Sequence, residues 1–103
     1  MKLTDLQPKW LVKDGARVGF TFISPTNPKW RQSCFVSPPK TSEQIDLFGD
    51  DDVQGCNPHA HWTIHGGIES ATWETMTVTP SLDGSAGGLW HGFITNGEIV
   101  GGL

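Results

Sequence analysis

The sequence lacks any long hydrophobic run. No stretch approaches the roughly 20 apolar residues that a membrane-spanning helix needs. The opening segment, MKLTDLQPKW, also lacks the apolar run of a signal peptide. These two absences predict a soluble, cytoplasmic protein that has no membrane partner.

Basic residues and cysteines are few. Seven Lys and Arg stand against eleven Asp and Glu, which gives a formal net charge of -4. Because nucleic-acid-binding domains usually carry a basic face that neutralises phosphates, this balance argues against direct binding of nucleic acid. The two cysteines, Cys34 and Cys56, are expected to be free thiols in a reducing cytoplasm.

The motifs of common catalytic sites are missing as well. There is no Gly-x-Ser-x-Gly elbow, and the glycine-rich run at 84–88 lacks the lysine of a phosphate-binding loop. Glu69, Glu74 and Asp83 have no spacing that assigns the roles of acid and base. An enzyme is therefore the less favoured class, and no catalytic residue is predicted.

Glycine and proline, in contrast, are frequent. Thirteen Gly and seven Pro divide its 103 residues into short segments, which is typical of a β-rich fold with tight turns. A chain of this length forms one domain, here 1–103, and its five Trp and five Phe supply much of a small core. We expect a mainly β (α+β) class: a compact antiparallel sheet or barrel-like fold with two tight hairpins and one short helix.

Two residue pairs predict the hairpins. Asp14-Gly15 and Asn96-Gly97 each lie between apolar runs and accept the positive φ angles of a two-residue turn. Alternation along 90–95 places His91 on the same side of its strand as Phe93. That side is either part of the core or the wall of a pocket.

The remaining elements are shorter or less regular. Thr41 and Gln44 fit a capping box, which predicts a helix over residues 42–48 that ends at Gly49. Strand formers bounded by Gly and Pro predict strands at 32–37, 61–65 and 71–79, the last closed by Pro80.

Histidines are clustered in the second half of the chain. At period two on one strand, His59, His61 and His65 would project to one side, a spacing from which imidazoles can converge on a metal ion. The commoner interpretation is that such histidines are exposed or hydrogen-bonded on a sheet surface. Both interpretations stay open at this point.

Two further groups are candidates for binding a partner. The run Asp50, Asp51, Asp52 is either a solvated turn or a site for a cation or a basic partner, and it does not fit a calcium loop. Tryptophan is enriched among binding hot spots, so Trp30, Trp73 and Trp90 would mark a partner surface if two of them were exposed together.

Two segments resemble an uncharacterised family of small phage and prophage proteins. They are TWETMTVTPSLD at 72–83 and WHGFITNGE at 90–98. The resemblance implies a phage origin and a small β fold. Wider relatives look like small zinc-binding domains, and residues that could substitute for their ligands here are His61, His91, Cys34 and Cys56.

The function predicted from these observations is a small phage-encoded, non-enzymatic binding or accessory protein whose partner is a host or phage protein. One form of this hypothesis is an inhibitor of a host defence system that occludes a protein surface. Two alternatives stay open. The first is a zinc-binding domain in which the ion is structural or hydrolytic, and the second is a minor virion component.

Overall fold

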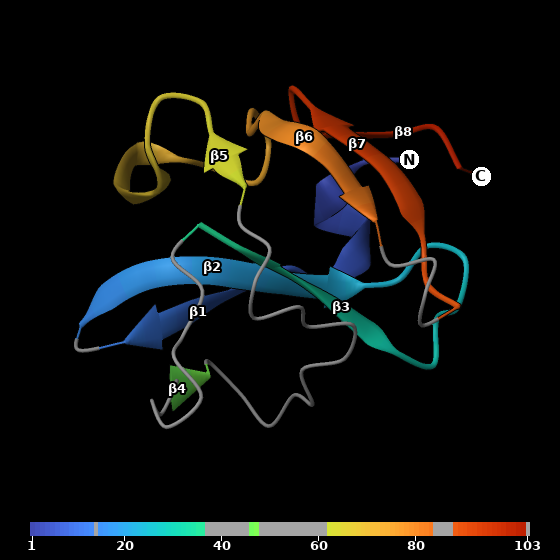
Figure 1. The fold of residues 1–103 in the computed structure, drawn as a ribbon, viewed down its shortest axis with the longest axis horizontal. Helices are drawn as coiled ribbons and strands as arrows, with labels where there is room; N and C mark the ends of the chain where they lie inside the picture. Colours follow the sequence, from blue (N-terminus) through green and yellow to red (C-terminus); the bar gives the residue numbers. More distant parts are fainter. Residues whose placement is uncertain (14, 37–45, 48–61, 84–87, 103) are drawn as a thin grey trace.

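The described residues form two antiparallel sheets of four strands each, which lie one above the other in Figure 1. The computed structural model describes residues 1–13, 15–36, 46–47, 62–83 and 88–102. The strand-rich architecture confirms the predicted mainly β class.

The first sheet has the strand order β3-β2-β1-β4, and the second has the order β5-β6-β7-β8. In the first sheet the strands are β1 (Lys9–Lys13), β2 (Ala16–Ile23), β3 (Arg31–Phe35) and β4 (Asp46–Leu47). In the second they are β5 (Thr63–Ile64), β6 (Val78–Asp83), β7 (His91–Thr95) and β8 (Glu98–Val100). Two short 3-10 turns, η1 (Leu3–Leu6) and η2 (Ile68–Ser70), complete the described elements.

The hydrophobic core draws its side chains from both sheets and from η1. Because apolar side chains of both sheets share one buried cluster, removing them from water stabilises the packing of one sheet on the other. The cluster consists of Leu3, Leu6, Phe20, Phe22, Cys34, Ile64, Met76, Val78, Leu82, Trp90, Ile94 and Ile99.

Both predicted hairpins are confirmed. Lys13 pairs with Ala16 across the first turn, where Gly15 has a φ of 79°. In the second hairpin both turn residues have positive φ, 48° for Asn96 and 74° for Gly97, as a type I′ turn requires. A Cβ on Gly97 would also overlap the carbonyl oxygen of Glu74, so the position needs glycine for space as well as for conformation.

The helix predicted over residues 42–48 is wrong where the structure describes that segment. Asp46 and Leu47 form β4, which pairs with Val12 and Leu11 of β1. Residues 42–45 and 48 lie outside the described residues. A two-turn helix is marginal on its own, and the open edge of β1 offers the backbone hydrogen-bond partners that override the local capping signal.

The strand predicted over 71–79 is displaced along the chain. Residues 73–75 form a turn, in which the Met76 amide donates to the Thr72 carbonyl at 3.0 Å. Strand β6 then begins at Val78 and continues through Pro80, where it was expected to end. The register of β6 against β7 shifts between Val78 and Leu82, and this irregularity accommodates a residue that has no backbone N–H to donate.

The other two predicted strands are present in shorter or shifted form. The strand expected at 32–37 is β3, Arg31–Phe35. Of the strand expected at 61–65, the structure shows Thr63–Ile64 as β5 and places His65 in the turn that follows.

Candidate functional site

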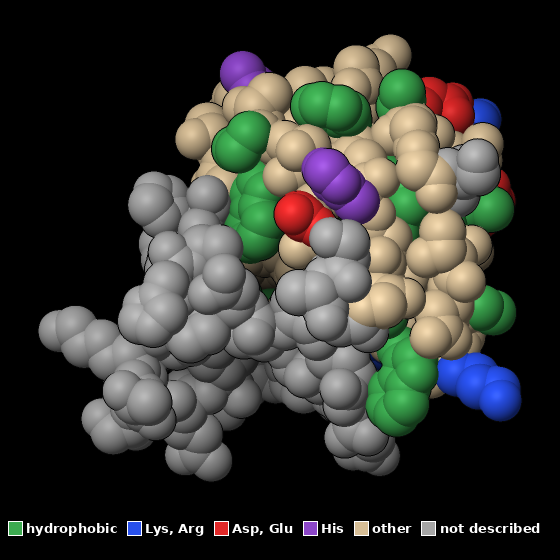
Figure 2. Space-filling model, turned by 45° about the vertical axis from the view of Figure 1, so that its right-hand side comes forward, with side chains coloured by type: hydrophobic (Ala, Val, Ile, Leu, Met, Phe, Trp, Pro, Cys, Tyr) green, Lys and Arg blue, Asp and Glu red, His purple; other side chains and the backbone are tan. Residues whose placement is uncertain are grey.

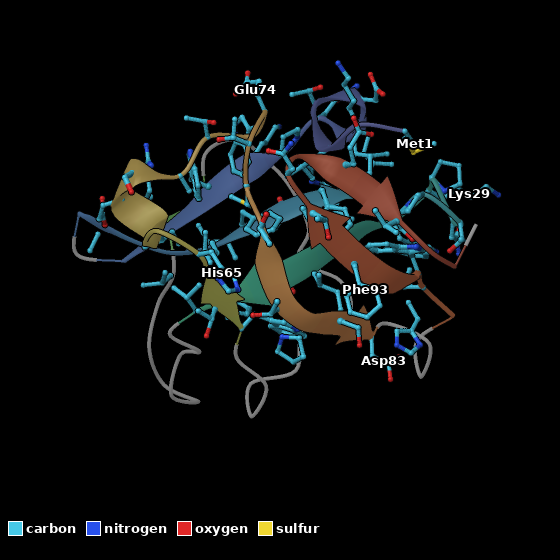
Figure 3. The ribbon with its side chains drawn as sticks, turned by 90° about the horizontal axis from the view of Figure 1, so that it is seen from above. Met1, Lys29, His65, Glu74, Asp83 and Phe93 are labelled. Carbon is cyan, nitrogen blue, oxygen red and sulfur yellow. The ribbon has the colours of Figure 1, made fainter. Side chains whose placement is uncertain are left out.

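The most distinctive surface of the described protein is the outward side of β6, β7 and β8. Along β7, Gly92 and Ile94 are buried while His91, Phe93 and Thr95 are exposed, which confirms the predicted alternation and shows that His91 faces outward. Figure 3 looks onto this sheet from above. We call the surface the outer face, and define it as Ser81, Asp83, His91, Phe93, Thr95, Glu98 and Val100.

The centre of the outer face is apolar. Phe93 is 47% exposed and Val100 is 45% exposed, and the two residues are paired across β7 and β8. Single exposed apolar residues are ordinary on a protein surface. A directly paired Phe and Val on a regular sheet instead form a small continuous apolar surface at a rigid position.

A polar cluster lies beside this apolar centre. His91 pairs in register with Asp83, and its Nδ1 lies 4.0 Å from the Asp83 Oδ1. Its Nε2 lies 3.3 Å from the Ser81 Oγ. The side chains of His91 and Asp83 are more than half exposed, and a histidine and an acidic side chain are seen together near the centre of Figure 2.

The other end of the outer face is polar too. Thr95 pairs with Glu98, and Glu98 forms an isolated antiparallel bridge with Lys2. A cavity of about 250 Å³ opens here between the hairpin, η1 and the 73–75 turn. It is lined by Lys2, Thr4, Glu74, Asn96, Gly97 and Glu98.

The scaffold beneath the outer face is fixed by Trp90. Its ring packs so closely on Gly92 that a Cβ on this glycine would overlap it. The indole Nε1 donates to the Gly101 carbonyl at 2.8 Å. On β6, the Ser81 carbonyl accepts from the Trp62 Nε1 at 3.0 Å. These contacts tie the backbone that carries His91, Phe93 and Ser81 to the rest of the fold.

The structure separates two of the predicted zinc ligands. Cys34 is a fully buried free thiol in the core, whereas the His91 side chain is exposed on the outer face. His61 and Cys56 lie outside the described residues. Among the residues that are described, no group of three or more His, Cys, Asp or Glu side chains could hold a metal ion.

Burial also makes Cys34 a poor nucleophile. Removal from water raises the pKa of its thiol far above the ordinary range, so the neutral thiol is the stable form at physiological pH. Its expected role is therefore that of a small apolar side chain in the core.

This burial predicts slow thiol chemistry. In a Cys56→Ser variant, Cys34 is expected to react with Ellman's reagent at about pH 8 at least roughly 100-fold more slowly than it does in denaturant, because the reactive thiolate forms only when the core opens. Absorbance of the released thiolate measures both rates. Stoichiometric reaction within seconds in the native protein would contradict the buried position.

The three tryptophans predicted to mark a partner surface have different environments. Trp90 is buried in the core, so it is not one of two tryptophans exposed together, which was the condition for a partner surface. Trp73 stacks on Trp10 with ring centroids 4.0 Å apart, and the Arg17 guanidinium lies 4.2 Å from the centroid of the Trp10 ring. Of the three, Trp30 alone is exposed. The aspartates predicted as a second binding group, Asp50, Asp51 and Asp52, lie outside the described residues.

Of the outer-face residues, sequence reasoning named only His91 as a candidate site residue and missed the others, among them Ser81, Asp83 and Val100. The alternating pattern had already placed His91 beside Phe93 on one side of β7. What it could not supply was the cross-strand register, because the irregularity in β6 shifts Ser81 and Asp83 relative to β7.

Comparisons with known proteins add no relative. No protein-family model, no curated protein and no solved structure matches the chain. Within the described residues, no helix is both long enough and apolar enough to cross a membrane.

Proposed function

We propose that this protein is a binding or accessory protein that acts by covering part of another protein's surface with its outer face. The observation that carries the proposal is the exposed pair Phe93 and Val100 at the centre of that face. An apolar centre with a polar rim is the usual anatomy of a protein–protein interface, in which a few central side chains supply most of the binding energy.

The charges around this centre indicate the chemistry of the partner. Acidic side chains lie at both ends of the outer face, Asp83 at one and Glu98 at the other. The whole chain carries a formal net charge of -4. A surface that presents an apolar projection flanked by Lys or Arg side chains is complementary to this arrangement, and its association should be slowed by salt.

The finer proposal is that the protein is encoded by a phage and that its partner is a bacterial host protein, such as a component of a defence system. Its support is the resemblance of the segments at 72–83 and 90–98 to small phage and prophage proteins, together with the acidic charge. Occlusion of a protein surface requires no catalytic group, so a small rigid sheet face is sufficient for it.

Replacing Phe93 with serine is expected to weaken partner binding by at least roughly tenfold, because burying a half-exposed phenyl ring contributes on the order of 2 kcal/mol to an interface. The partner is first captured from a host lysate with the full-length protein and identified by mass spectrometry. Its purified form is then measured by biolayer interferometry against wild-type and variant protein at several salt concentrations.

Trp30→Ser is the matched control, since Trp30 is 45% exposed and lies outside the outer face. It should leave the dissociation constant nearly unchanged. Loss of binding in this control, with Phe93→Ser still binding normally, would assign the interface to another surface. A wild-type dimer in light scattering that Phe93→Ser converts to a monomer would instead identify the occupant as a second copy and overturn the proposed partner.

A further inference from the structure

We propose that Ser81 is a nucleophile that His91 and Asp83 activate, and that it accepts acyl groups from small carboxylic esters. This inference goes beyond a binding role and does not depend on it, because it concerns the reactivity of one hydroxyl in the protein alone. No catalytic motif in the sequence predicts this site, because the three residues meet only in the folded structure.

The order of contacts is the one that nucleophilic catalysis by serine requires. The hydroxyl faces one nitrogen of the imidazole, with Ser81 Oγ and His91 Nε2 3.3 Å apart. The carboxylate faces the other nitrogen, with Asp83 Oδ1 and His91 Nδ1 4.0 Å apart. Distances of this kind are often long in proteins without a bound substrate and shorten when the reacting group arrives.

Each residue has a separate part in the reaction. The neutral imidazole accepts the hydroxyl proton at Nε2, which makes Ser81 Oγ the nucleophile. The Asp83 carboxylate favours the tautomer with a proton on Nδ1 and stabilises the imidazolium that forms. Asp83 and His91 are cross-strand partners of β6 and β7, so the carboxylate is placed next to the ring.

The proposed reaction is ester hydrolysis in two stages, and water is its only co-reactant. Ser81 Oγ attacks the ester carbonyl carbon while its proton passes to Nε2. The tetrahedral intermediate then collapses, its carbon–oxygen bond to the alcohol breaks, and the leaving alkoxide takes the proton from Nε2. Water attacks the acyl group in the same way, gives a proton to Nε2 and releases the carboxylic acid, and Ser81 Oγ recovers its proton.

The surroundings of the cluster select the substrate class. Phe93 follows His91 two positions along β7 on the same face and offers an apolar surface for the acyl chain. His91 and Asp83 are open to solvent, so a small substrate can reach the site. Small esters with short apolar acyl groups and good leaving groups fit this arrangement best.

A second hydroxyl–imidazole pair in the same sheet provides an internal control. His65 Nε2 lies 2.9 Å from the Thr79 Oγ1, a shorter contact than that of Ser81 with His91. In the described part of the chain, no carboxylate forms an ion pair with His65. If proximity to an imidazole were sufficient, Thr79 would react at least as readily as Ser81.

The test uses the full-length protein and a fluorophosphonate probe. Its phosphorus is attacked by Ser81 Oγ and loses fluoride, which leaves a stable adduct that intact mass and peptide mapping can locate. We expect one adduct per chain, on Ser81, and none on Thr79. His91→Asn should slow labelling by at least roughly 100-fold, in line with the usual effect of removing a general base. Asp83→Asn should slow it by about tenfold, an effect kept small by exposure to solvent.

The control variants His65→Asn and Thr79→Val should label Ser81 at the wild-type rate. A Ser81→Ala variant should take up no adduct. This variant should hydrolyse p-nitrophenyl acetate only at the slower rate that the His91 imidazole supports without the serine. Melting curves establish that each variant is folded before it is compared. No adduct on wild-type protein, an adduct on another residue, or equal Ser81 labelling in His91→Asn would overturn the proposal, whereas loss of partner binding would leave it standing.

Discussion

Replacing Trp90 with alanine is expected to lower the free energy of unfolding by about 4 kcal/mol, in the range measured for large core aromatics changed to alanine. A small domain has a total stability of roughly 5 to 15 kcal/mol, so this substitution should remove between about a quarter and most of it. Equilibrium unfolding in guanidinium chloride, followed by circular dichroism, measures the loss.

Trp90 contributes this much to the free energy of unfolding because it lies in the core. Its ring makes an edge-on contact with Phe22 of β2, with centroids 6.0 Å apart, and packs against Gly92 of its own strand. Its indole N–H donates a hydrogen bond to the carbonyl of Gly101. One residue therefore connects the two sheets and anchors the end of the chain after β8.

Two related substitutions separate these contributions. Trp90→Phe retains part of the ring but loses the hydrogen bond to Gly101, and should cost about half as much as Trp90→Ala. Trp30→Ala removes the same residue type from an exposed position and should cost no more than about 1 kcal/mol. Equal losses at Trp30 and Trp90 would contradict the buried position of Trp90.

Replacing Gln32 with alanine is expected to cost about 3 kcal/mol, because it leaves two buried backbone groups without partners. The Gln32 Nε2 donates to the Trp90 carbonyl at 2.8 Å, and its Oε1 accepts from the Trp90 amide at 3.1 Å. The side-chain amide thus takes the place of a neighbouring strand and joins β3 to the chain that enters β7. Chemical denaturation measures the effect.

Ser33→Ala is the matched control for Gln32→Ala. Ser33 is the next residue on β3 and is also buried, but its hydroxyl has no hydrogen-bond partner among the described residues. Its removal should be neutral or slightly stabilising, since no bond is lost. A large loss in Ser33→Ala would show that truncation in β3, rather than the missing amide, accounts for the cost.

Gln32→Glu should make stability depend on pH. The introduced carboxyl can replace the amide fully only when protonated, because it must donate to the Trp90 carbonyl, and burial there raises its pKa above the ordinary value of about 4.3. The folded state then binds the proton more tightly than the unfolded state. Stability is therefore retained below pH 4 or so and falls as the pH rises toward the raised pKa. Unfolding curves at pH 4 and pH 7 compare the two states.

Local signals predicted the parts of the fold that depend on adjacent residues. The Asn96-Gly97 turn and the placement of His91 and Phe93 on one side of β7 both follow from backbone conformation and the period of a strand, and both are confirmed. The helix over 42–48 failed because the edge of β1 pairs with residues 46–47. The strand predicted over 71–79 failed at its start because residues 73–75 form a turn, and at its end because β6 continues through Pro80 at an irregularity in its pairing with β7.

The sequence by itself determined the strand-rich class, the two hairpins and which residues of β7 share a side, since each depends on residues close together in the chain. Only the tertiary structure decided that Trp90 and Cys34 are core residues and that Ser81, Asp83 and His91 meet on one face. The physical reason is register. Which side chains lie opposite each other is set by how strands that are separated in the sequence pair with each other. Ser81 and His91, for example, are 10 positions apart, and a bulge changes such pairing without a clear local signal.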